Sequence, residues 1–159
     1  VQVRSEDPIS AVTRSELTGA DLPGDTVGAP VDFTLVAPAP EIGSHAMSSL
    51  PAQGSAGRLT LIGSAPSAAT VIPMAADGSA GEPLTVDVPA DATVSLTSDQ
   101  LQVGQERAAG ITIVPEVPGA VHASWTQRES DGSDAVLLSS LPILSARGGQ
   151  DPVTVRLAP

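Results

Sequence analysis

The stretch Val121-His122-Ala123-Ser124-Trp125-Thr126 alternates between apolar and polar residues. A period of two is typical of a β-strand with one buried and one exposed face. It places Val121, Ala123 and Trp125 on the inner face and His122 on the outer face. Because the chain has one tryptophan, one phenylalanine and no tyrosine, we expect Trp125 to be the one large side chain of the core.

The same alternation recurs about every ten residues, as expected for a sandwich or a barrel. Between these segments, Asp77-Gly78 and Asp131-Gly132 provide the glycine that a tight hairpin turn requires. We therefore predict an all-β fold, an antiparallel Ig-like β-sandwich, with propeller-blade-like four-stranded sheets as the alternative. The expected strands are residues 1–4, 32–36, 58–62, 69–74, 84–88, 94–97, 111–114, 121–126, 134–139 and 153–157.

An internal similarity suggests how the chain is organised. Residues 6–12 followed by 33–40 are similar to residues 116–121 followed by 136–142. We predict a single all-β domain over residues 1–159, made of an N-terminal partial unit (about 1–54) and a complete unit (about 56–159). Residues 38–57, rich in Pro, Ala, Ser and Gly, are the expected connector. Residues 7–19 carry helix signals at both ends, but the similarity favours strands there.

Charge and composition exclude several classes of function. The chain has eighteen acidic residues, seven arginines and no lysine, so its net charge is −11, which repels nucleic acids and anionic lipid surfaces. We predict no nucleic-acid partner. The most apolar run, residues 59–76, is interrupted by Gly, Ser and Pro, so we also expect no direct insertion of this segment into a membrane. The absence of cysteine excludes disulfide scaffolds and thiol nucleophiles.

The residues that could carry catalysis do not form a known motif. His45 falls in the expected connector and His122 lies on the outer face of a strand, and no Gly-x-Ser-x-Gly elbow accompanies either of them. The sequence contains neither a dinucleotide-binding nor a phosphate-loop motif. We therefore predict that the protein is not an enzyme and has no cofactor.

One loop has a composition that calcium favours. Glu129, Asp131 and Asp134 are candidate calcium ligands because they place three carboxylates within six residues. The ordinary interpretation is a solvated Asp-Gly hairpin turn, and the spacing of an EF-hand is absent. No metal site is predicted, and these three residues stay the candidates if one exists.

Several elements together resemble a known group of proteins. Residues 59–63, 69–71, 86–96 and 118–123 are similar to repeat modules of uncharacterised secreted or membrane-anchored actinobacterial proteins, and the resemblance covers roughly residues 56–159. It implies a β-sandwich and an extracytoplasmic location, and it implies no activity. Residues 1–8 are polar and charged, so we expect no signal peptide within this sequence.

Three functions remain as hypotheses. The first is a non-catalytic extracytoplasmic structural or protein-interaction module, whose partner would be another cell-envelope protein. The alternative is a β-sandwich module that binds a small ligand or calcium. The third is a hydrolase.

Overall fold

The computed structural model describes residues 6–7, 11–18, 30–51, 56–130 and 136–146. Apart from one 3-10 turn, η2, the regular elements within these ranges are β-strands, so the predicted all-β class is confirmed. In chain order they are β1 (Thr13–Thr18), β2 (Pro30–Val36), β3 (Ala46–Ser49), β4 (Ala56–Gly63), β5 (Ser67–Met74), β6 (Leu84–Val88), β7 (Thr93–Thr97), η2 (Ser98–Gln100), β8 (Gln102–Val103), β9 (Glu106–Arg107), β10 (Gly110–Pro115), β11 (Val121–Ser130) and β12 (Val136–Pro142).

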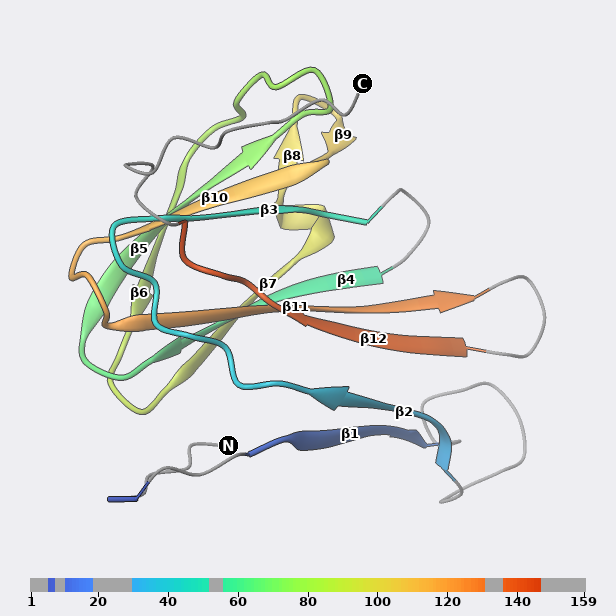
Figure 1. Cartoon of the computed structure of the whole chain (residues 1–159). Coiled ribbons are helices and arrows are strands. Elements are labelled where there is room, and N and C mark those ends of the chain that lie inside the picture. Colours follow the sequence, from blue (N-terminus) through green and yellow to red (C-terminus); the bar gives the residue numbers. More distant parts are fainter. Residues whose placement is uncertain (1–5, 8–10, 19–29, 52–55, 131–135, 147–159) are drawn as a thin grey trace, which may run out of the picture.

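Eight of these strands form two antiparallel sheets that pack face to face (Figure 1). The first, here called the β11 sheet, has the strand order β12-β11-β4-β7. The second, the β10 sheet, has the order β3-β10-β5-β6. Because buried side chains of both sheets belong to one hydrophobic cluster, the sheets form a sandwich and not separate propeller blades.

Alternate residues of each strand face this shared core, as the period of two requires. On β11, Val121, Ala123 and Trp125 are buried and His122 is half-exposed, which confirms the predicted phase. With one exception the buried apolar side chains are aliphatic. They are Ile42, Ala46, Leu59, Leu61, Ala69, Val71, Val88, Leu96, Leu101, Ala108, Ile111, Ile113, Ala120, Val121, Ala123, Trp125 and Ile143.

Trp125 is the exception, and its predicted place in the core is confirmed by an exposure of 5%. Its indole N–H donates to Oε1 of Gln127 at 3.3 Å. Gly57 on β4 faces the ring, and a Cβ atom at this position would lie 1.9 Å from Cζ2 of Trp125. The indole therefore fills the space that a side chain at position 57 would need.

The turn predicted at Asp77-Gly78 is confirmed. Gly78 has a φ of 86°, and Oδ1 of Asp77 accepts from both the Ser79 hydroxyl (2.7 Å) and the Ser79 backbone N–H (2.9 Å). These two hydrogen bonds stabilise the ionised carboxylate and hold the pKa of Asp77 below its ordinary value. The second predicted turn, at Asp131-Gly132, lies outside the described residues.

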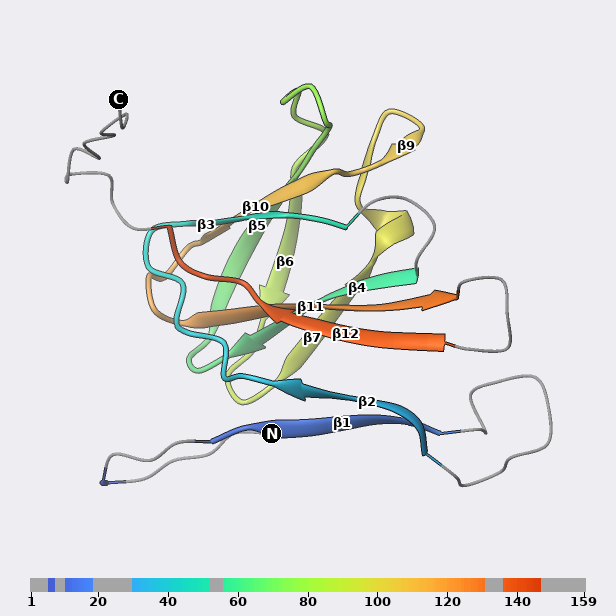
Figure 2. The ribbon, with the colours of Figure 1, turned by 45° about the vertical axis from the view of Figure 1, so that its right-hand side comes forward.

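The N-terminal strands β1 and β2 form an antiparallel pair, with Arg14 opposite Leu35 and Glu16 opposite Phe33. Both ribbon views place β2 beside β12, at the edge of the β11 sheet (Figures 1 and 2). The backbone N–H of Leu138 on β12 donates to Oδ2 of Asp32 at 2.7 Å. A side-chain carboxylate thus links the β1–β2 pair to the sandwich.

One expectation about the N-terminal third needs correction. Residues 46–49, placed in the connector 38–57, form strand β3, which pairs with β10 and buries Ala46 in the core. Residues 13–18 form strand β1, in agreement with the internal similarity, which favours strands over a helix in residues 7–19. The strand expected at residues 32–36 is confirmed as β2. The strands expected at residues 1–4 and 153–157 lie outside the described residues.

Candidate functional site

The two histidines weighed as catalytic residues have different neighbours. Nδ1 of His122 lies 2.8 Å from the carbonyl oxygen of Ala39, and Nδ1 of His45 lies 3.1 Å from the hydroxyl of Ser44. Neither ring is paired with a carboxylate among the residues that the structure covers. Each therefore lacks there the acid that orients the imidazole of a catalytic triad.

The candidate calcium ligands fall largely on undescribed positions. Asp131 and Asp134 lie outside the described residues, and of Glu129 only the backbone is described, paired with Leu137 between β11 and β12. In the described ranges no group of three or more His, Asp or Glu side chains could hold a metal ion. The calcium hypothesis stays a prediction.

The outer face of the β11 sheet carries hydroxyl groups and two arginines. Leu59 and Leu61 face the core, so Arg58 and Thr60 on β4 face outward. Arg58 lies directly opposite Thr126 on β11. Arg128 stands two residues beyond Thr126 on the same face, which makes the two arginines diagonal neighbours across the strand pair.

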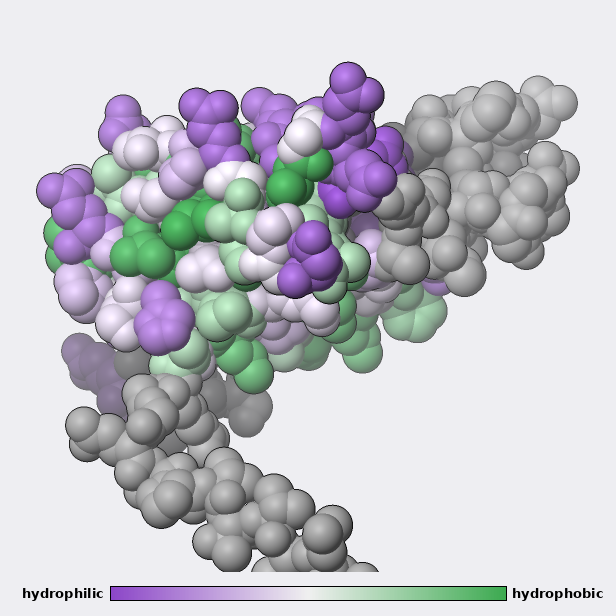
Figure 3. All heavy atoms as spheres, turned by 90° about the horizontal axis from the view of Figure 1, so that it is seen from above, coloured by the Kyte–Doolittle hydropathy of each residue, from purple (hydrophilic) through white to green (hydrophobic). Residues whose placement is uncertain are grey.

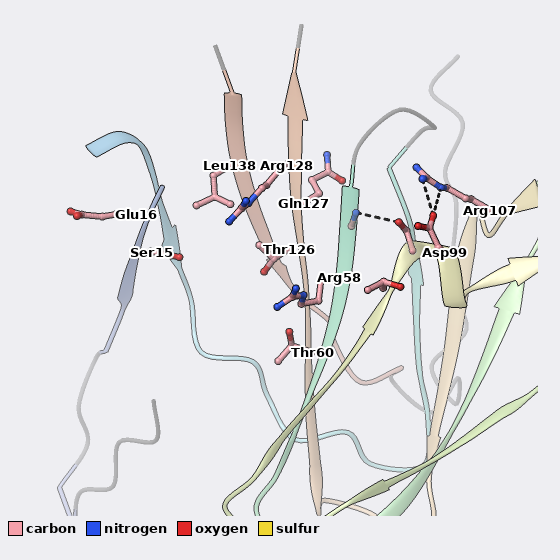
Figure 4. A pocket seen from close by; sticks show the side chains of 13 residues that line it. Ser15, Glu16, Arg58, Thr60, Asp99, Arg107, Thr126, Gln127, Arg128 and Leu138 are labelled. Atoms are coloured by element: carbon pink, nitrogen blue, oxygen red, sulfur yellow. Dashed lines mark hydrogen bonds and ion pairs between the residues drawn. The ribbon is translucent and has the colours of Figure 1, made fainter. Parts of the chain in front are cut away.

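A cleft of about 520 Å³ lies over this face (Figure 4). Arg58, Thr126 and Arg128 contribute side chains from the sheet, and β1 stands opposite them. In Figure 4 the side chain of Ser15 on β1 points toward the sheet, and that of Glu16 points away from it. Asp99 of η2 and Arg107 of β9 line the other end of the cleft.

The charges that line the cleft are unequally paired. Arg107 donates to Oδ1 of Asp99 from Nε (3.2 Å) and from Nη2 (2.8 Å), and Glu16 forms an ion pair with Arg14 on the outer side of β1. Within the described ranges, Arg58 and Arg128 have no ion pair and no side-chain hydrogen bond. A chain with a net charge of −11 therefore presents two unpaired guanidinium groups in one cleft.

The outer face of the β1–β2 pair exposes two apolar side chains. Phe33 and Leu35 alternate with Asp32 and Thr34, so the two apolar side chains share the face that points away from the sandwich. Their exposed fractions are 51% and 58%. The guanidinium carbon of Arg14 lies 4.5 Å from the centre of the Phe33 ring, within the range of a cation–π interaction. We call Phe33, Leu35 and Arg14 the hairpin surface.

A third surface lies on the opposite side of the sandwich, over the β10 sheet. Met47 and Val114 are exposed there, and a depression of about 340 Å³ lies between the ends of β3, β5 and β10. In the view of this side, hydrophobic residues form a band between hydrophilic ones (Figure 3). The lining of the cleft over the β11 sheet is more polar than the lining of this depression.

Arg58 and Arg128 are not among the candidate residues that the sequence predicts. The alternation places both side chains on the outer face, because Arg58 precedes Leu59 in an alternating segment and Arg128 continues the outward series of His122 and Thr126. The sequence does not show that the two arginines lie near each other, because this depends on the register between β4 and β11, which no local pattern specifies.

The sequence matches no protein-family model and no curated protein. Among solved structures, it is similar to the "Crystal Structure of Thermotoga maritima 1070", with a TM-score of 0.51 and 13% identity, over 66% of this chain and 96% of that chain. At this identity the likeness concerns the fold alone. As a separate structural finding, no helix in the described ranges has the length and apolar character needed to cross a membrane. The strand arrangement of this chain thus recurs in an experimentally determined protein.

Proposed function

We propose that this chain is a non-catalytic, extracytoplasmic Ig-like module that binds another cell-envelope protein through its hairpin surface. The observation that supports it most is the position of Phe33. The chain has only two aromatic residues of the Phe, Tyr and Trp class, and one of them stands 51% exposed on a strand pair that projects from the sandwich. The location is supported by the resemblance of residues 56–159 to secreted and membrane-anchored modules.

An exposed phenylalanine carries an energetic cost that a binding partner would remove. Complete burial of such a side chain contributes about 1.5–3 kcal/mol, and Phe33 obtains only part of this in the isolated chain. Leu35 stands beside it on the same face and is similarly exposed. Contiguous exposed apolar side chains of this kind mark sites of protein association.

Arg14 adds a second feature of interface hot spots. Its guanidinium stacks on Phe33 and pairs with Glu16, so the hairpin surface combines an aromatic anchor with an oriented cation. Aromatic residues and arginine are the types enriched at the centre of protein interfaces. The surface therefore fits a partner that offers an apolar pocket with a polar rim.

Site-specific photocrosslinking in the native host tests this function. Phe33 is replaced in the full chain by benzoylphenylalanine, and Thr85, exposed on β6 of the opposite sheet, is replaced in the same way as the control. We expect one envelope protein to crosslink from position 33 and not from position 85. We also expect Leu35→Glu to abolish that product, because a charge would then face the apolar pocket.

Three results would contradict the proposal. They are equal crosslinking from positions 33 and 85, no product from position 33, and products made only of cytoplasmic proteins. Circular dichroism shows whether the Leu35→Glu variant is folded, so that loss of the crosslink is not mistaken for unfolding of the chain. Because position 35 is more than half exposed, we expect the stability to change by less than about 0.5 kcal/mol.

A further inference from the structure

We infer that the cleft over the β11 sheet binds a small oxyanion, a ligand with a carboxylate or phosphate group, held between Arg58 and Arg128. This site does not depend on the proposed function, because it lies on a different surface from Phe33 and Leu35. Its chemistry follows from the charges, donors and dimensions of the cleft.

The two arginines are placed where they repel each other. They are diagonal neighbours on one face of β4 and β11, and like charges in such positions are unfavourable. The carboxylates that line the cleft do not relieve this, since Asp99 accepts from Arg107 and Glu16 pairs with Arg14. An anion between the two guanidinium groups would replace repulsion with two attractions.

The donors of the cleft match an oxyanion. A guanidinium group presents parallel N–H donors that fit two oxygens of a carboxylate or a phosphate. The hydroxyl of Thr60 lies on the same face and has no hydrogen-bond partner in the part of the chain that the structure covers. Thr126 stands between the arginines, with its hydroxyl 3.2 Å from that of Ser140. Arg58, Arg128 and Thr60 are therefore among the groups of the cleft that are left to donate.

The size and surroundings of the cleft favour a small ligand over a polymer. Its volume of about 520 Å³ lies in the range of about 300–1,000 Å³ that small molecules occupy in proteins. The strand β1 stands on one side of it (Figure 4). A long polyanion would also have to approach a chain whose net charge is −11, which opposes its binding.

Titration of the full chain tests this site. Inorganic phosphate and succinate are added separately at low ionic strength, against sodium chloride of equal ionic strength, while calorimetry and the arginine Nε–H signals in NMR are followed. We expect saturable binding of at least one of them, with shifts at Arg58 and Arg128. Loss of one charge-assisted contact in Arg58→Gln or Arg128→Gln should weaken binding about tenfold.

Thr85→Asp is the matched control. It lowers the net charge by the same one unit at an exposed residue of β6, on the sheet opposite the cleft, so we expect it to leave the affinity unchanged. Binding of phosphate alone assigns a phosphate ligand, and binding of succinate alone assigns a carboxylate. Absence of saturable binding for both, or an equal loss in Thr85→Asp, would overturn the inference. Neither result bears on crosslinking from position 33, so the two proposals fail separately.

Discussion

Replacing Gly57 with alanine tests how closely the core packs around Trp125. The added methyl group would lie 1.9 Å from Cζ2 and 2.6 Å from Cη2 of the indole, far inside the contact distance of about 3.5 Å between carbon atoms. The ring is 5% exposed and its N–H bonds Gln127. Relief of the clash therefore requires a shift of the ring or of the β4 backbone.

The magnitude results from two opposing effects. In an unstrained position, Gly→Ala stabilises a protein by about 0.4–1 kcal/mol because it restricts the unfolded chain. Overpacking of a well-filled core costs about 1–3 kcal/mol. We expect Gly57→Ala to lose about 1–2 kcal/mol, which corresponds to a fall in Tm of roughly 2–8 °C for a chain of this length.

Urea unfolding followed by far-UV circular dichroism measures this loss. Gly43→Ala is the control, because the nearest atom to its Cβ would be Oγ of Ser145 at an ordinary 3.4 Å, and it should be neutral or stabilising. In a Trp125→Phe background, which lacks the part of the ring that clashes, the cost of Gly57→Ala should nearly vanish. Equal stability of Gly57→Ala and the natural chain, or an equal cost of Gly57→Ala in both backgrounds, would refute the predicted clash.

Two further predictions concern the hairpin and one turn. Asp32→Asn leaves a single side-chain oxygen to accept from the backbone N–H groups of both Leu138 and Phe33. Hydrogen exchange at the Leu138 amide should therefore accelerate at least about tenfold, while Ile113 in the core keeps its protection. Unchanged protection at Leu138 would show that Asp32 does not hold the β1–β2 pair against β12. The carboxyl of Asp77 should titrate below its ordinary pKa of 3.8 and move up toward that value in Ser79→Ala, because the Ser79 hydroxyl is the largest cause of the shift. Since the pKa of the folded state is the lower one, the stabilisation from this turn is present above pH 3.8 and is lost as the pH falls through the lowered value. NMR titration of the Asp77 carboxyl carbon measures this pKa, and equal values in the natural chain and in Ser79→Ala would contradict the prediction.

The strands that the sequence predicts best are those whose pattern is local. Residues 84–88 alternate regularly and form β6 with the same bounds. Residues 46–49 contain no such signal, since Ala46-Met47-Ser48-Ser49 is short and has no β-branched residue. They become strand β3 because β10 offers them an edge. Residues 13–18 likewise form β1 by pairing with β2, which overrides the helix signals around them.

The candidate surfaces depend on the same non-local information. Alternation in residues 32–36 indicates that Phe33 and Leu35 share a face, and by itself it favours burial of that face. The structure half-buries the polar side instead, because Asp32 bonds Leu138 and the neighbouring outer face of the β11 sheet is rich in hydroxyl groups. The exposure of Phe33 and the convergence of Arg58 with Arg128 are therefore properties of strand packing, and they could not be read from composition.

The two proposed sites lie on opposite sides of strand β1, and this makes them separable by experiment. Phe33 points away from the sandwich, whereas Ser15 points toward the cleft (Figure 4). We expect Phe33→Ala to keep the phosphate or succinate affinity within about twofold, since Phe33 does not line the cleft. In turn, Arg58→Gln should leave crosslinking from position 33 unchanged. If saturating phosphate abolished that crosslink, the cleft would be occupied by an acidic part of the partner, and the assignment of a small ligand would be wrong.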